Sequence, residues 1–122
     1  MRALVVLYDA GCEFCRGARD WLAAQPKRIP VGFLPAGSAE ARAIYPDVDH
    51  DRTLGELTAI DDRGNIFREE KAWIVSLWTT QNHHLMAKRL SSAPLLPVAR
   101  ATTAWIGRNR KKLGPAAKWF KP

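Results

Sequence analysis

The chain has only two cysteines among its 122 residues, and it has no apolar run long enough to span a bilayer. Two cysteines cannot form the dense disulfide framework of a small secreted domain. The opening apolar run, residues 3–7, is short and lacks the small-residue cleavage site of a secretory signal. From these absences we expect a soluble, cytoplasmic protein.

Acidic residues are absent after residue 87, whereas residues 1–87 contain twelve of them beside ten Lys or Arg. Residues 88–122 contain nine Lys or Arg, so the net charge of +7 arises from the C-terminal segment. Such a segment is either a solvated helix end or a docking site for an acidic partner protein or an anionic membrane surface. Trp105, Trp119 and Phe120 offer rings for base stacking, but no recognised nucleic-acid motif accompanies them, so we do not expect a nucleic-acid partner.

The remaining composition is that of a folded globular chain, with 47% hydrophobic and 25% charged residues. The length fits one domain, since domains have about 100–200 residues. We expect a single domain over residues 1–122, with a core at 1–80 and a basic helical C-terminal extension at 81–122.

The first third of the chain predicts a strand, a helix and a second strand. Residues 3–8 are continuously apolar and rich in β-branched side chains, which is typical of a central strand buried on both faces. Residues 31–34 predict the second strand. The intervening helix, residues 12–24, has one apolar face that consists of Phe14, Cys15, Ala18, Trp21 and Leu22.

Helices and strands alternate along most of the rest of the chain. We predict a short helix at 39–45, a polar loop at 47–52, a hairpin of strands at 56–60 and 66–68, and helices at 72–80, at 85–90 and beyond Pro97. The order βαβαββα predicts an α/β fold of thioredoxin-like arrangement. It has a central four-stranded mixed sheet and additional C-terminal helices.

Cys12 and Cys15 form a Cys-x-x-Cys pair where the first strand meets the first helix. A helix N-terminus offers unpaired N–H groups and about half a positive charge, which favours the reactive thiolate. We therefore predict that Cys12 attacks a substrate disulfide and that Cys15, one turn further in and more buried, resolves the mixed disulfide. The substrate is a disulfide-containing protein or a low-molecular-weight thiol, and no cofactor is expected.

Asp9, at the end of the strand, completes the predicted site. Its carboxylate either accepts the proton of the resolving thiol or only caps the helix. Arg16 and Arg19 add positive potential to the first helix, and Glu13 between the cysteines opposes it.

The alternative to an enzyme is a non-catalytic binding module in which the cysteine pair is structural or binds zinc. Zinc would need two further ligands, and the only histidines are His50, His83 and His84, none at ordinary zinc-finger spacing. The tryptophans follow apolar helical stripes, which predicts core positions with one or two lining the rim near the cysteines; they are Trp21, Trp73, Trp78 and Trp105.

The segment Asp9-Ala10-Gly11-Cys12-Glu13-Phe14-Cys15 resembles the Asp-x-x-Cys-x-x-Cys signature of the DCC family of predicted thiol–disulfide oxidoreductases, a thioredoxin-like group. The strand–turn–strand and helix from Leu57 to Trp78 and the basic tail are also similar to that family. The resemblance implies redox activity at Cys12 and Cys15 and marks Asp9 as a signature position. Thioredoxins proper have a cis-proline before the third strand, whereas residues 52–56 contain none, so we expect different substrate docking, with Thr53 as a candidate contact.

Overall fold

The computed structural model describes residues 1–92, 94–109 and 112. Trp119 and Phe120, named above for the basic tail, lie outside these described residues, as do the basic residues Arg110 and Lys111. The strands are β1 (Leu4–Tyr8), β2 (Val31–Pro35), β3 (Thr58–Asp61) and β4 (Ile66–Arg68).

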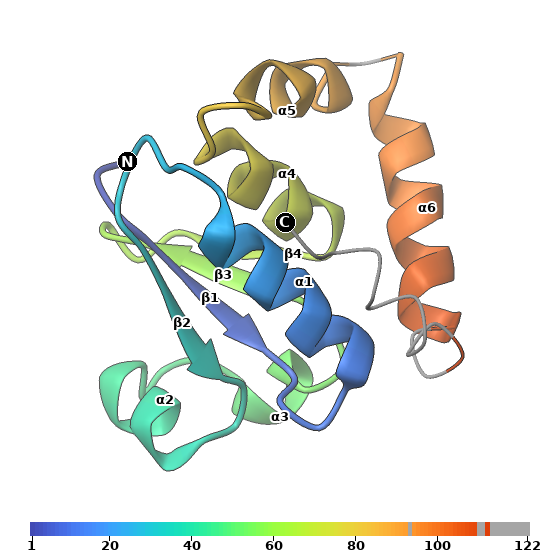
Figure 1. The fold of residues 1–122 in the computed structure, drawn as a ribbon. Helices are drawn as coiled ribbons and strands as arrows, with labels where there is room; N and C mark the ends of the chain where they lie inside the picture. The colour runs from blue at the N-terminus through green and yellow to red at the C-terminus, as the bar shows by residue number, and fades with distance from the viewer. Residues whose placement is uncertain (93, 110–111, 113–122) are drawn as a thin grey trace.

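The four strands form one sheet in the order β2-β1-β3-β4 (Figure 1). β1 pairs in parallel with β2 and antiparallel with β3, and β3 pairs antiparallel with β4. The sheet is therefore mixed and four-stranded with β1 in its interior, which confirms the α/β fold class predicted from the sequence.

The helices are α1 (Glu13–Ala24), α2 (Ala39–Ile44), α3 (His50–Thr53), α4 (Glu70–Trp78), α5 (His84–Leu90) and α6 (Leu96–Asn109). The loop predicted at 47–52 was wrong in part, because α3 begins within it. Asp49 caps α3 by accepting a hydrogen bond from the amide of Arg52 at 3.2 Å. A helix of one turn is too short to show an apolar period, so the cap was its only signal.

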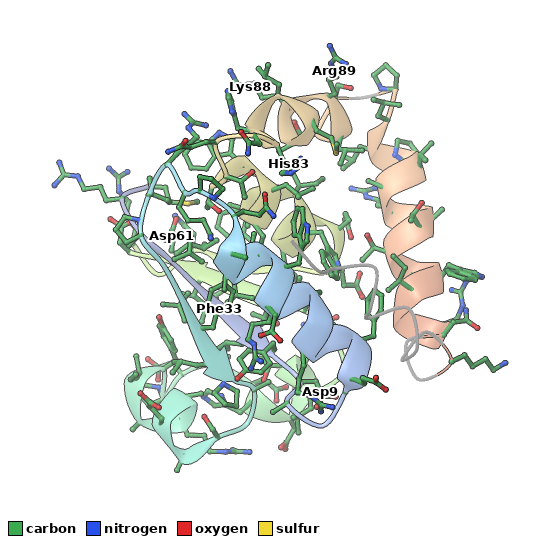
Figure 2. All side chains as sticks on the ribbon, in the orientation of Figure 1. Asp9, Phe33, Asp61, His83, Lys88 and Arg89 are labelled. Atoms are coloured by element: carbon green, nitrogen blue, oxygen red, sulfur yellow. The ribbon has the colours of Figure 1, made fainter. Side chains whose placement is uncertain are left out.

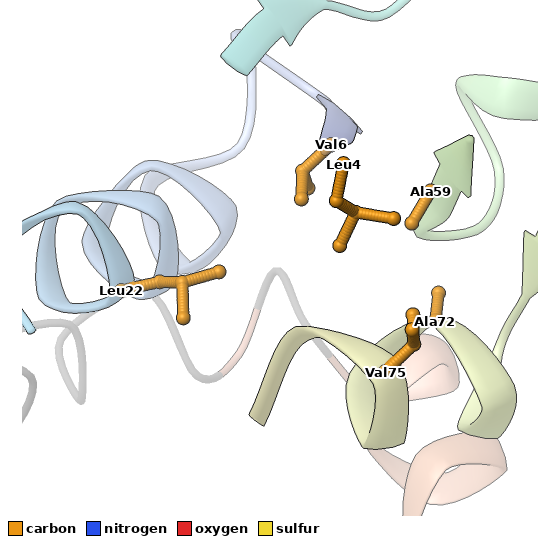
Figure 3. Close-up of a cluster of buried hydrophobic side chains, with 6 residues drawn as sticks. All are labelled: Leu4, Val6, Leu22, Ala59, Ala72 and Val75. Carbon is orange, nitrogen blue, oxygen red and sulfur yellow. The ribbon is translucent and has the colours of Figure 1, made fainter. Parts of the chain in front are cut away.

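Alternation along β1 divides the core between the two faces of the sheet. Leu4 and Val6 point to the face covered by α1 and α4, where Leu22 and Val75 meet them in one buried cluster (Figure 3). Val5 and Leu7 belong to a second cluster, on the other face. A strand buried on both faces has to be apolar at every position, which is why this segment has no polar alternation.

The two ends of the sheet carry different polar residues, Asp9 and Asp61 (Figure 2). Asp61 closes the β3–β4 turn, since its carboxylate accepts hydrogen bonds from the amides of Arg63 and Asn65 and from the Asn65 side chain, each at 2.9 Å. The side-chain bond from Asn65 is the main reason that the pKa of Asp61 lies below its ordinary value. The turn is thus fixed by one carboxylate, far from the cysteines.

The C-terminal helices are more exposed than the core. No described residue of α6 is buried, and Val98 and Trp105 on it are 58% and 51% exposed. The core position predicted for Trp105 was therefore wrong, whereas Trp21 and Trp73 are partly buried. None of the helices formed by the described residues has both the length and the apolar character needed to cross a membrane.

Candidate active site

Helix α1 begins beside a cysteine, because Cys12 is the residue that caps its N-terminus. The Cys12 backbone is extended, with φ -108° and ψ 117°, and its Sγ accepts a hydrogen bond from the amide of Cys15 at 3.3 Å. Both cysteines are free thiols. The sulfur thus takes the place of the serine or aspartate oxygen that usually receives the first free N–H groups of a helix.

The burial of the two cysteines is the reverse of the prediction. Cys12 is 8% exposed, whereas Cys15 is only partly buried. The apolar face of α1 that carries Cys15 was expected to meet a filled core. It instead faces a cavity, so Cys15, one turn into the helix, is the more exposed residue.

The turn before α1 is held by several short bonds. The Asp9 carboxylate accepts a hydrogen bond from the amide of Gly11 at 2.9 Å, and the Asp9 carbonyl accepts one from the amide of Cys12 at 3.2 Å. Arg16 reaches back from the helix and donates to the Ala10 carbonyl at 2.6 Å. Asp9 therefore stabilises the turn that precedes Cys12. The residue that caps α1 is Cys12, and not Asp9 as one of the two predicted roles required.

A cavity of about 260 Å³ lies against Cys15, on the sheet face covered by α1 and α4. Asp9, Trp21 and Trp73 line it, so two of the tryptophans lie at the cavity wall that includes Cys15. Ile106 of α6 lines it as well, although it is 91 residues from Cys15 in the sequence. The C-terminal extension thus contributes to the wall of the candidate site.

Arg19 lies at this cavity with its charge already paired. It donates to the Tyr8 hydroxyl at 2.7 Å and forms an ion pair with Asp20 at 2.6 Å. The guanidinium also lies 4.6 Å from the centre of the Tyr8 ring. Arg19 is therefore fixed at the wall by three contacts.

Glu56 is a third charged wall residue, beside Asp9 and Arg19, and sequence reasoning did not select it. Its carboxylate lies 2.6 Å from Arg52 and 3.5 Å from Arg68. A hydrogen bond between the carboxyl groups of Glu56 and Glu69 raises the pKa of Glu69, and burial adds to that shift. Glu56 thus joins the cavity wall to a small network of charged groups.

Thr53, the candidate docking residue, lines the cavity but is only 2% exposed. Its hydroxyl donates to the carbonyl of His50 at 2.7 Å, which fixes the end of α3. No cis peptide bond occurs among the described residues. The segment before β3 therefore forms part of the wall without the cis-proline geometry of thioredoxins proper.

The three histidines make contacts away from the cysteines. His50 Nε2 lies 2.7 Å from the Tyr45 carbonyl, His83 packs on Trp21 with ring centres 5.1 Å apart, and His84 Nδ1 lies 3.0 Å from the Gln81 carbonyl. Within the part of the chain that the structure describes, no three His, Cys, Asp or Glu side chains are grouped as metal ligands would be.

The sequence did not identify the cavity-lining residues that are distant from the Cys-x-x-Cys motif along the chain. Leu57, Leu77 and Ile106 belong to apolar patterns that were read only as core, and Glu56 and Gly107 gave no local signal. A pattern shows which face of an element is apolar, but not whether the space it faces is filled.

Comparison with known proteins gives one match, and it agrees with the geometry. Neither a search of curated proteins nor a search of solved structures gives a match. The model of the DCC1-like thiol-disulfide oxidoreductase family matches residues 6–115, which include both cysteines, Asp9 and every helix described above. The chain therefore belongs to the DCC1-like thiol-disulfide oxidoreductase family.

Proposed function

We propose that this chain exchanges electrons with a protein disulfide or a low-molecular-weight disulfide, with Cys12 as the attacking thiol and Cys15 as the resolving thiol. The observation that carries the proposal is the hydrogen bond from the Cys15 amide to Cys12 Sγ at the start of α1. An N–H donor stabilises a thiolate more than a thiol, since hydrogen bonds to charged acceptors are the stronger ones.

The proposed exchange has two steps. The Cys12 thiolate attacks one substrate sulfur, the substrate S–S bond breaks, and the other substrate sulfur leaves as a thiolate that takes up a proton. The Cys15 thiolate then attacks Cys12 Sγ, which forms the Cys12–Cys15 disulfide and releases the second substrate thiol. Two electrons pass to the substrate, and an external dithiol, or two molecules of a thiol, then reduces the Cys12–Cys15 disulfide back to two thiols.

Asp9 has a proposed role in the second step. Cys15 has to lose its proton before it attacks, and Asp9 lines the same cavity as Cys15. We propose that the Asp9 carboxylate accepts this proton in addition to bracing the turn through Gly11.

Reduction of insulin by dithiothreitol tests the proposed activity. The wild type should accelerate the reaction, and the double variant Cys12→Ser, Cys15→Ser should give only the uncatalysed rate. Equal rates for these two proteins would reject the enzyme and leave the cysteine pair as a structural feature. Zinc content measured on the same samples would then decide whether the pair binds metal.

An anionic membrane surface is the partner that we propose for the C-terminal extension. Exposed apolar side chains on α5 and α6 occur next to basic ones. Leu85 and Met86 are 60% and 50% exposed, and Lys88 and Arg89 extend outward at the end of α5 (Figure 2). Apolar burial combined with attraction to acidic headgroups is how interfacial helices bind.

Sedimentation with lipid vesicles tests this partner. The protein should pellet with phosphatidylglycerol–phosphatidylcholine vesicles at low salt, and less with phosphatidylcholine alone. The double variant Lys88→Glu, Arg89→Glu should lose binding, while the control Lys71→Glu, an exposed lysine of α4, should keep it. Equal pelleting of the two variants would reject the proposed surface.

A further inference from the structure

We propose that the cavity beside Cys15 binds a neutral, apolar substituent of the disulfide substrate, such as an aromatic ring or a branched aliphatic group. The inference rests on the proposed function and names its substrate class. It concerns the space between α1, α4, α6 and the sheet, and not the cysteines themselves.

Size and lining both suit an apolar group. A cavity of about 150 Å³ lined by aliphatic and aromatic side chains is enough to hold benzene. This cavity has about 260 Å³, which leaves room for a ring and its linker. Its walls are mostly apolar and come from six helices and strands, with Phe14, Phe33, Trp73 and Leu77 among the lining residues.

The charged wall residues already have partners within the chain. Arg19 is paired with Asp20, Glu56 is paired with Arg52 and Arg68, and the Asp9 carboxylate accepts the Gly11 amide. An anionic ligand would have to leave water without gaining a new counter-ion, because Arg19 is already paired, and this loss is costly in an apolar site. The wall therefore favours a neutral group over the carboxylates of a strongly polar thiol.

The position of Cys15 links this cavity to the chemistry. When Cys12 forms a mixed disulfide with the substrate, a substituent seated in the cavity lies beside the resolving thiol. Cys15 then attacks Cys12 Sγ, the mixed disulfide breaks, and the apolar thiol leaves with a proton. The substituent is thus held until the step that releases it.

Two matched disulfides test the preference. The homodimers of acetyl-Phe-Cys-amide and acetyl-Ser-Cys-amide have closely similar leaving thiols and differ in one neutral side chain. With dithiothreitol as reductant, we expect kcat/KM for the phenylalanine peptide to be at least about tenfold higher, because its ring is buried. Equal values for the two peptides would overturn the proposal.

A matched pair of variants tests whether the cavity is responsible. Gly107 lies at the cavity, and a Cβ there would meet no atom within 4 Å among the described residues. Gly107→Phe should therefore obstruct the cavity without disturbing the core and should reduce the preference to near unity. Ala104→Phe, at another exposed position of α6, should keep it. A preference unchanged in Gly107→Phe would contradict the assignment.

A binding measurement separates this proposal from the exchange chemistry. 4-Fluorobenzyl alcohol, followed by fluorine NMR, should bind the double variant Cys12→Ser, Cys15→Ser and should bind Gly107→Phe more weakly. Probe binding without turnover of either peptide would reject the exchange reaction and retain the cavity as a binding site. Turnover of both peptides at equal rates without probe binding would overturn the cavity proposal and retain the exchange reaction.

Discussion

The amide of Cys15 donates to the Sγ of Cys12 at 3.3 Å, so one cysteine supports the other through its backbone and not through its side chain. Replacing the Cys15 side chain therefore leaves this bond in place. We expect Cys15→Ser to attack a substrate disulfide and to stop at the mixed disulfide, because the resolving sulfur is missing. Mass spectrometry of the protein after incubation with a peptide disulfide should show one attached peptide.

The reciprocal variant is the control for these roles. Cys12→Ser should remain unmodified under the same conditions. Cys15 is the more exposed of the two residues. The opposite result, with the peptide attached to Cys15 in Cys12→Ser and none in Cys15→Ser, would therefore reverse the assignment of the two thiols.

Substitution of Asp9 separates its two roles. Asp9→Asn keeps an oxygen that can accept the Gly11 bond but removes the carboxylate. If Asp9 takes the proton of Cys15, the resolution step should slow by about 100-fold with an unchanged unfolding temperature. Stopped-flow release of the second thiol measures this step. A wild-type rate in Asp9→Asn, with a slow rate only in Asp9→Ala, would limit Asp9 to the turn.

Asp61 should make the stability of the fold depend on pH. Its pKa is lowered, so its carboxylate stabilises the fold above the ordinary aspartate pKa of about 3.9, and this contribution is lost as the pH falls through the lowered value. We expect Asp61→Asn to unfold at a lower temperature than the wild type at pH 7, with the difference shrinking in acid. Thermal unfolding by circular dichroism measures it, with the exposed Asp47→Asn as the control. A difference that is constant with pH would contradict this reading.

Glu69 has a backbone conformation that favours glycine, with φ 53° and ψ -123°. Its amide donates to the Leu57 carbonyl at 3.0 Å, which holds the chain in this geometry before α4. Relief of the strain should outweigh the greater freedom of glycine in the unfolded chain, so we expect Glu69→Gly to raise the free energy of unfolding by about 1 kcal/mol. Urea unfolding measures this change.

Glu69→Ala is the matched control for that prediction. It removes the same carboxyl group, and with it the hydrogen bond to Glu56, but keeps a Cβ. Equal gains in the alanine and glycine variants would trace the effect to the paired carboxyl groups instead of the backbone.

Much of the fold was accessible from local patterns. The unbroken apolar run of β1 indicated an interior strand, and the two short strands predicted at 56–60 and 66–68 indicated the β3–β4 hairpin; both features are present. The position of Cys12 at the start of α1 was also predictable, because the sequence shows both the end of an apolar strand and the beginning of an amphipathic helix.

Local sequence patterns did not determine which apolar residues are buried, because burial depends on how the helices and strands pack together. Trp105 has a core-like spacing but is exposed, because α6 contacts the rest of the protein over a limited area. Cys15 lies on an apolar stripe but faces a cavity, because the elements opposite it do not fill the space. The periodicity of apolar residues indicates which face of a helix is apolar. It does not indicate whether the neighbouring elements fill the space that this face adjoins.

The ion pair between Arg100 and Glu70, at 3.2 Å, fastens α6 to α4 at one point, and Ile106 further along α6 forms part of the cavity wall. A molecule that fills the cavity and contacts Ile106 would therefore strengthen the attachment of α6 by the same factor by which attachment strengthens its binding. Binding beside Cys15 would then affect the position of the basic extension, although most of the chain lies between the two in sequence.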